Sequence, residues 1–257
     1  MSNHISFSAL KLWNDCPFKY KLTYIDNVQK FRGSEYTIFG TSLHEACEKK
    51  LLDNNINEVE YFLNKFDEEL KNIPSDVQLD PNLLTEMKEQ GKTLASMALP
   101  ALKEKFGNFK VLAAEEDIFE TIKKIPELNY NFKGYIDLII QTEDNKIHIL
   151  DWKTCAWGWD AKKKSDPMIT YQLTFYKYFY SQKHNIDPKN IETYFALLKR
   201  TAKKDNVEIF RVTSGDKKTE NAFNLLTKAL YSINKGFFPK NRLACKYCEY
   251  NKTKDCP

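Results

Sequence analysis

The feature that most constrains the fold is a change of pattern near residue 109. Three segments rich in β-branched and aromatic residues follow it, at residues 109–122, 130–140 and 146–153, whereas helical spacing of apolar residues dominates before it. The last two segments are separated by the polar turn 141–145, so we expect a hairpin. Helices that lead into strands, with a later helix packed back on the sheet, indicate an α/β or α+β core.

Capping residues place the other elements. Expected helices span residues 8–16, 35–52, 165–181 and 217–235, with two more between 57 and 106, and further strands span 191–199 and 206–212. Ser8 is the expected cap of the first helix, and Asp80 followed by Pro81 opens the fourth. Pro100 is expected to bend or end that helix, because an interior proline removes a backbone hydrogen bond.

Composition excludes several classes of protein. With 257 residues, 42% hydrophobic and 29% charged, the chain can bury a sizeable core and is neither disordered nor collagen-like. No apolar run is long enough for a membrane span, and the first four residues begin no secretory signal, so we expect a cytoplasmic protein. The 39 Lys and Arg against 35 Asp and Glu give +4, which by itself identifies no nucleic-acid partner.

Two carboxylates and a lysine stand in the expected hairpin. Asp137 lies on one strand, and Asp151 and Lys153 share a face of the next, because side chains alternate along a strand. Apolar residues surround all three, and an ionised carboxylate in such surroundings is costly unless something pairs with it. A bound Mg²⁺ or Mn²⁺ would pair with both carboxylates, and such ions carry waters that can attack a phosphate.

The register of the hairpin bears on this interpretation. Asp137 and Asp151 share a face only if Asp144 lies at the centre of the turn, or if a bulge shifts the register. The alternative is a solvated strand end at which Lys153 merely neutralises Asp151. These residues alone leave both interpretations open.

Two helices carry polar pairs beside apolar positions. His44 and Glu48 are four residues apart at the border of a buried stripe, where a lone histidine is more often structural than a ligand. Gln172 and Tyr176 repeat the spacing, and both side chains can donate a hydrogen bond to a phosphate. The structural alternative for this second pair is a buried polar pair at the edge of the sheet.

Cysteine spacing suggests a metal site. Cys245 and Cys248 form a CxxC, and Cys256 follows closely. In a reducing compartment, clustered thiols favour metal binding over disulfides. Cys47 is expected to be a core residue, and Cys155 has no expected role beyond packing.

These motifs occur in a distinctive order along the chain. The segments are His4–Ser8, Cys16–Tyr20, Gly40–Glu45, Gly134–Asp137, Asp151–Thr154, Gln172–Tyr176 and Gly236–Pro239, the last followed by the three clustered cysteines. In their order and spacing they resemble, almost from end to end, the RecB-like branch of the PD-(D/E)XK nucleases, which includes AddB and CRISPR-associated exonucleases with four cysteines. Two positions depart from the family pattern: no proline precedes Asp137, and Asp151 stands where many relatives have glutamate.

The resemblance implies a restriction-endonuclease-like α/β fold, with a mixed central β-sheet flanked by helices. One nuclease domain would span residues 1–257. Within it, residues 1–108 would form a mainly helical N-terminal part and residues 109–235 the nuclease core. Residues 236–257, together with Cys16, would form an iron–sulfur segment.

The resemblance also implies roles for the hairpin residues. Asp137, Asp151 and Lys153 would be catalytic, and Lys153 would orient or activate the attacking water. His44, Asp137, Asp151 and the backbone carbonyl of Trp152 would bind Mg²⁺ or Mn²⁺. Phosphodiester hydrolysis needs this kind of metal-activated water and electrostatic stabilisation more than it needs a covalent nucleophile.

Further residues would complete the DNA-binding surface. By the resemblance, Gln172 and Tyr176 would bind the DNA backbone. Glu115 or Glu116 could add a carboxylate, and the sequence does not choose between them. Lysine-rich segments at 162–164, 199–200 and 203–204 could line the approach, although charge runs are usually solvated surface.

The resemblance assigns four cysteines, Cys16, Cys245, Cys248 and Cys256, to a [4Fe-4S] cluster. Thiolates also suit zinc, so the residues alone do not separate the two; the resemblance favours iron–sulfur. Because such a site would close nearly the whole chain into one loop, its role would be structural.

The leading hypothesis is therefore a metal-dependent DNA exonuclease acting in recombination, repair or phage DNA processing, in a bacterial cell. Its substrate would be single-stranded DNA or duplex ends, and a recombination or helicase protein could be its partner. The alternatives are a non-catalytic DNA-binding subunit with a structural iron–sulfur or zinc site, and a binding protein with a zinc-ribbon tail.

Overall fold

A computed structural model describes residues 3–28 and 32–257 of the chain. The helices are α1 (Phe7–Asp15), α2 (Pro17–Tyr20), α3 (Glu35–Leu52), α4 (Glu58–Asn72), α5 (Pro81–Phe106), α6 (Ala161–Ser165), α7 (Pro167–His184) and α8 (Asp216–Asn234). The strands are β1 (His4–Ser6), β2 (Phe109–Thr121), β3 (Asn131–Thr142), β4 (Ile147–Cys155), β5 (Ile191–Lys199) and β6 (Val207–Val212). Short π or 3₁₀ helices occur at Lys21–Ile25, Pro126–Leu128, Pro188–Asn190 and Arg242–Tyr247.

The strands form one mixed sheet. β2–β3, β3–β4 and β5–β6 are antiparallel pairs, whereas β1–β3 and β4–β5 are parallel. The parallel β4–β5 pair requires a crossover, which α6 and α7 supply. The expected fold class, a mixed sheet flanked by helices, is confirmed.

Strand β3 has one edge that is shared between two partners. β1 pairs with it as far as Lys133, and β4 pairs with it only from Leu138 onward. Residues 134–137 of β3 therefore have no ladder partner on that edge, while residues 134–136 are paired with β2 on the other. This unpaired stretch carries the Gly134–Asp137 motif.

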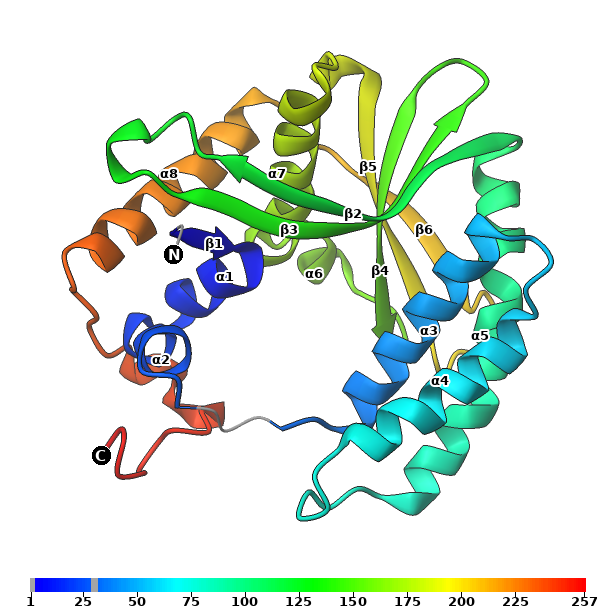
Figure 1. The fold of residues 1–257 in the computed structure, drawn as a ribbon, viewed down its shortest axis with the longest axis horizontal. Helices are drawn as coiled ribbons and strands as arrows, with labels where there is room; N and C mark the ends of the chain where they lie inside the picture. The colour runs from blue at the N-terminus through cyan, green and yellow to red at the C-terminus, as the bar shows by residue number, and fades with distance from the viewer. Residues whose placement is uncertain (1–2, 29–31) are drawn as a thin grey trace.

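Helices cover both faces of the sheet. One apolar cluster packs α1, α7 and α8 against it, around Phe175, Phe179 and Leu226. The other packs α3, α4 and α5 against the opposite face, around Leu43, Phe62 and Trp152. Figure 1 shows α3, α4 and α5 grouped at one side of the molecule, and α1, α2, α8 and both chain ends at the other.

Several sequence predictions are confirmed in detail. The helix expected over residues 35–52 is α3, and the strand expected over 191–199 is β5, both with the predicted bounds. In the hairpin, Leu138 pairs with Leu150 and Ile139 with Ile149, which places Asp144 at the centre of the turn. This is the register that the shared face of Asp137 and Asp151 required.

Other predictions were wrong in position. The cap of α1 is Ser6 rather than Ser8, since the Ser6 hydroxyl accepts a hydrogen bond from the Ala9 N–H at 3.1 Å. Of the two outcomes expected at Pro100, a bend or an end, the end is excluded, because α5 runs on to Phe106; the bend stays a prediction. Pro100 and Ser96 are both exposed, so water can satisfy the carbonyl that the proline leaves without a donor. The sequence prediction also missed β1 and α6, which are too short for a periodic signal.

None of the helices in the described part of the chain is long and apolar enough to cross a membrane.

Candidate active site

The candidate active site lies where β3 and β4 part. Beyond Leu138 the Trp152 N–H has no ladder acceptor on β3, and Asp137 Oδ2 accepts its hydrogen bond instead, at 2.7 Å. Asp151 and Lys153 flank Trp152 on β4, so their side chains point to the α7 face while the Trp152 ring packs among α3–α5. The divergence of the strands thus places both carboxylates at one point.

Asp151 is enclosed by two donors. Its side chain is 1% exposed; Lys153 Nζ lies 2.5 Å from Oδ2, and Gln172 Nε2 donates to Oδ1 at 2.8 Å. Burial opposes the positive charge of Lys153, but the carboxylates of Asp151 and Asp137 outweigh it and raise the lysine pKa. Lys153 is therefore a firmly charged ammonium directed at the site.

Gln172 and Tyr176 are placed by α7, which opens with Pro167 and is capped by Asp166. The Gln172 amide donates to Asp151 and also to the Tyr176 hydroxyl, at 3.0 Å. Both polar groups therefore support the carboxylate in this structure. The structural alternative for the pair, a buried polar pair at the edge of the sheet, does not fit fully, because Gln172 is half-buried and Asp151 lies on the inner strand β4. Binding of DNA by Gln172 and Tyr176 stays a prediction.

Gly134 makes room for Tyr176. A Cβ built on Gly134 would lie 2.8 Å from a ring carbon of Tyr176, closer than real side chains approach. The motif at the unpaired stretch of β3 thus needs glycine so that α7 can approach closely enough for Gln172 to reach Asp151.

His44 approaches from the other side of the sheet, on α3. Its Nε2 atom is buried and has no hydrogen-bond partner among the described residues. Burial, and then the nearby charge of Lys153, lower the pKa of His44 to about 3, so the imidazole is neutral. A neutral imidazole with a buried nitrogen that lacks a partner is the form in which histidine binds metal ions. The adjacent Glu45 instead contacts α4, where Tyr61 and Lys65 bind it.

Glu48, one turn after His44, adds a further buried carboxyl. It is 7% exposed, and burial, followed by repulsion from Asp137 and Glu115, raises its pKa to about 8. Burial and the charge of Asp151 also raise the pKa of Asp137 to about 8. Several carboxyls thus share a small region with one lysine, which is an arrangement that a divalent cation would stabilise.

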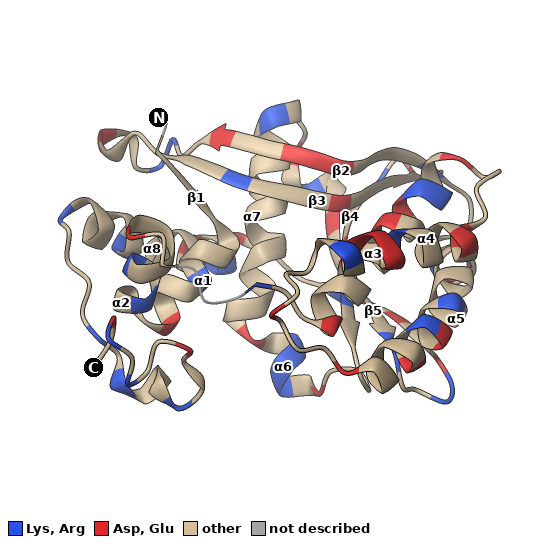
Figure 2. Cartoon of the chain, turned by 60° about the horizontal axis from the view of Figure 1, so that its bottom comes forward, with Lys and Arg blue, Asp and Glu red and all other residues tan. Residues whose placement is uncertain are grey.

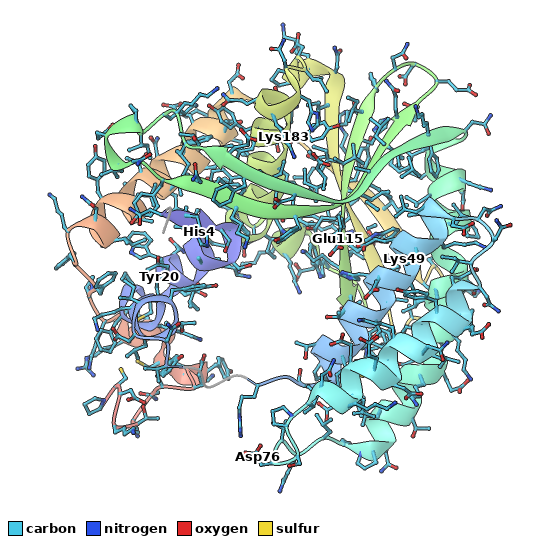
Figure 3. The ribbon with its side chains drawn as sticks, in the orientation of Figure 1. His4, Tyr20, Lys49, Asp76, Glu115 and Lys183 are labelled. Carbon is cyan, nitrogen blue, oxygen red and sulfur yellow. The ribbon has the colours of Figure 1, made fainter. Side chains whose placement is uncertain are left out.

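The structure distinguishes Glu115 from Glu116, the two residues on β2 that could add a carboxylate to the site. Glu116 forms ion pairs with Lys183 at 2.7 Å and His184 at 3.0 Å, both at the end of α7. Glu115 has a left-handed backbone conformation, with φ at 56°, and its charge acts on Asp137 and Glu48. In Figure 3, Glu115 and Lys183 lie on opposite sides of the β2–β3 ribbon. Of the two, Glu115 is therefore the one whose charge reaches Asp137 and Glu48, and its unusual backbone could not be foreseen from the sequence.

The residues present fit a divalent cation by donor type. They offer hard carboxylate oxygens and the unpartnered nitrogen of His44. Within residues 3–28 and 32–257 no three His, Cys, Asp or Glu side chains form a group that could hold a metal ion. Asp151 instead contacts Lys153, and Asp137 accepts the hydrogen bond of the Trp152 N–H.

These shifted pKa values predict how stability depends on pH. Because the carboxyls of Asp137 and Glu48 ionise near pH 4 in the unfolded chain but near pH 8 when folded, the native state binds more protons between these limits. We therefore expect the metal-free protein to lose on the order of a few kcal/mol of unfolding free energy from pH 5 to pH 8, with the lowered pKa of His44 offsetting part of this loss below about pH 7. Denaturant titrations in EDTA would measure the change.

Two glutamate variants provide the control for this pH dependence. Glu48→Gln should flatten it, whereas Glu45→Gln, which removes a carboxylate bound by Lys65 and Tyr61, should not. A metal-free stability that rises over the same pH range would contradict the placement of these carboxyls.

The structure brings the four predicted cluster cysteines to one cavity, but within residues 3–28 and 32–257 no three of them form a group that could hold a metal ion. Cys16, Cys245, Cys248 and Cys256 line one cavity, and Cys47 and Cys155 lie elsewhere, in the cores. The Asn241 N–H points to the Cys16 sulfur at 3.3 Å, and the Phe18 N–H donates to the Pro239 carbonyl. Segments near both ends of the chain thus line the same cavity. Figure 1 shows α2 beside the C-terminal segment.

Comparison with known proteins decides the family. The sequence pattern of the PD-(D/E)XK nuclease superfamily matches residues 4–253. This chain belongs to that superfamily. No curated protein matches its sequence.

A solved structure supports the fold. A crystal structure from Eubacterium rectale, provisionally described as an exonuclease, covers 100% of this chain and 91% of its own, with a TM-score of 0.64 at 14% identity. The crystal structure of SSO0001 covers 95% of this chain and 93% of its own, with a TM-score of 0.40 at 15% identity, too low to support an argument. At these identities the likeness to the first structure concerns the fold.

Proposed function

We propose that this PD-(D/E)XK nuclease is a metal-dependent DNA exonuclease, acting in recombination, repair or phage DNA processing within a bacterial cell. The observation that supports it best is the group where β3 and β4 diverge: the buried Asp151, the half-buried Asp137, a charged lysine directed at them and an unpartnered histidine nitrogen. DNA ends or single strands would be the substrate, and a recombination or helicase protein a partner.

Each residue of the candidate site would have its own role in cleavage. His44, Asp137, Asp151 and the Trp152 carbonyl would hold Mg²⁺ or Mn²⁺, and a bound ion would supply a water of lowered pKa and neutralise charge on the phosphate. The Lys153 ammonium would move away from the Asp151 carboxylate. It would then orient the attacking water and stabilise the charge that develops on the phosphate oxygens. Gln172, bonded to Tyr176, would keep Asp151 in place while this happens.

The arrangement of the cysteines supports a [4Fe-4S] cluster as a second cofactor. Four thiols around one cavity suit such a cluster, and the amide directed at the Cys16 sulfur is the kind of donor that stabilises a metal-bound thiolate. Lys19, Lys240 and Arg242 also line the cavity and would offset the negative charge of the thiolates. Zinc is the less favoured occupant, and iron and sulfide analysis of anaerobically purified protein distinguishes the two.

A nuclease assay tests the proposed activity. End-labelled single-stranded and duplex DNA should be shortened in Mg²⁺ or Mn²⁺ and left intact in EDTA. Binding of DNA with no cleavage under any of these conditions would favour the non-catalytic alternative.

His44→Ala should raise the metal concentration needed for half-maximal cleavage by about tenfold or more, because one ligand of several is lost. Excess Mn²⁺ should restore part of the activity, and thermal stability in EDTA should change little. Cys47→Ala, one turn away on the buried side of α3, provides the control for packing. If His44→Ala unfolds the protein and leaves the metal requirement unchanged, the histidine is structural.

A further inference from the structure

A groove opens beside Lys153 and Gln172, on the α7 side of the sheet. It lies between α1 and the α6–α7 segment and has a volume of about 440 Å³, within the range typical of small-ligand sites. The active-site pair Lys153 and Gln172 forms one end of its wall, so an occupant of the groove would be continuous with a substrate at the site.

The groove has a basic rim. Lys11 of α1 and Lys163 of α6 line it and are exposed, and neither ammonium is paired with a carboxylate in the part of the chain that the structure describes. Together with Lys153, they face a single acidic lining residue, Asp15. Figure 2 shows α6 as a basic segment between the group formed by α1, α2 and α8 and the group formed by α3, α4 and α5.

The three consecutive lysines of α6 differ in their surroundings. Lys164 is paired with Glu208 on β6. Lys163 lines the groove, with its ammonium 4.9 Å from the centre of the Trp159 ring. Lys162 is exposed but does not line the groove. Only the middle lysine of the run is therefore placed for a ligand in the groove.

The floor of the groove is apolar. Leu12, Trp159, Met168 and Ile169 line it and are only partly buried. A floor of this kind suits the flat face of a nucleobase, while the lysines of the rim suit phosphates. In a duplex the bases are stacked and paired, so they do not reach such a floor; an unpaired nucleotide does.

We infer that this groove binds an unpaired nucleotide of the DNA strand next to the scissile phosphate, with Lys11 and Lys163 on the flanking phosphates. The inference rests on the proposed function and deepens it, because it makes an unpaired strand the preferred substrate. A duplex end would have to fray before it could enter.

Binding of a fluorescent oligodeoxythymidylate to the full chain, in EDTA, tests the basic rim. Lys11→Ala and Lys163→Ala should each weaken binding about fivefold and lower the slope of log Kd against log salt by about 0.7, as expected for one lost phosphate contact on a single strand. Lys162→Ala, the neighbour outside the groove, should change neither quantity.

A steric variant tests the floor without altering charge. Ser8 is exposed on α1 and lines the groove, so Ser8→Trp should fill it and weaken oligodeoxythymidylate binding at least about fivefold, while binding of a blunt hairpin duplex stays within about twofold. Asn14→Trp, also exposed on α1 but outside the groove, should affect neither ligand.

The outcomes separate the groove from the proposed function. If the wild type cuts DNA in Mn²⁺ but Lys163→Ala behaves like Lys162→Ala, or Ser8→Trp like Asn14→Trp, the groove assignment is wrong and the nuclease proposal stands. If the wild type cuts no DNA, the proposed function fails and the groove assignment fails with it.

Discussion

Lys153→Ala and Asp151→Ala should each lower DNA cleavage by about 10³-fold or more, while single-stranded DNA binding changes far less. Asp151 is 1% exposed and bound by both Lys153 and Gln172, so its removal leaves these two side chains without the carboxylate that they share. Lys153 carries the positive charge directed at that point, and the loss of one such stabilising group alone typically costs 10²–10³ in rate. Rates measured on a labelled oligonucleotide in Mg²⁺ and in Mn²⁺ would test both variants.

The choice of control matters for these substitutions. Lys199 is also a buried lysine, at the end of β5, but its ammonium lies 3.8 Å from Glu208. Lys199→Ala should therefore leave the metal-saturated rate within about tenfold of the wild type, even if it lowers stability by a few kcal/mol. Wild-type rates for Lys153→Ala or Asp151→Ala in both metals would show that the active site lies elsewhere.

The second large effect concerns the cysteines. Substituting serine for Cys16, Cys245, Cys248 or Cys256 should remove nearly all bound iron and sulfide, because a four-thiolate site that loses one ligand is open to solvent. Soluble yield should fall as well, since the cavity that these thiols line joins segments from near both ends of the chain.

The two remaining cysteines supply matched controls. Cys47→Ala should keep the full metal content and cost on the order of 1 kcal/mol of unfolding free energy, the price of a small cavity in the α3 stripe. Cys155→Ser should also keep its metal. Retention of iron by Cys16→Ser together with its loss from Cys47→Ala would overturn the ligand assignment.

Much of this fold could be predicted from local pattern. The register of the hairpin followed from the spacing of Asp137 and Asp151 about Asp144, and the bounds of α3 followed from its apolar stripe. These features depend on residues close in the sequence, where periodicity and turn chemistry are informative. The same reasoning placed the cap of α1 two residues late, because Ser6 and Ser8 are equally good caps by residue type.

The parts of the site that escaped prediction depend on contacts between distant segments. Glu115 and Glu116 are equivalent as sequence, and only the pairing of Glu116 with α7 and the left-handed backbone of Glu115 separate them. Likewise, nothing in the spacing of Gln172 shows that its amide would be directed at Asp151. That contact needs the space that Gly134 leaves for Tyr176, on a strand nearly forty residues earlier.

The meeting of the chain ends has a consequence for biosynthesis. Cys16 and Phe18 contact residues 239–241, which leave the ribosome only after every strand of the sheet has been made. The sheet can therefore form on the nascent chain while the thiol-lined cavity is still incomplete, and Cys16 must wait for partners more than two hundred residues away. Metal loading would then be a late step, and a chain that stalls or is cut before Cys245 would carry the nuclease motifs without three of the four thiols that line the cavity.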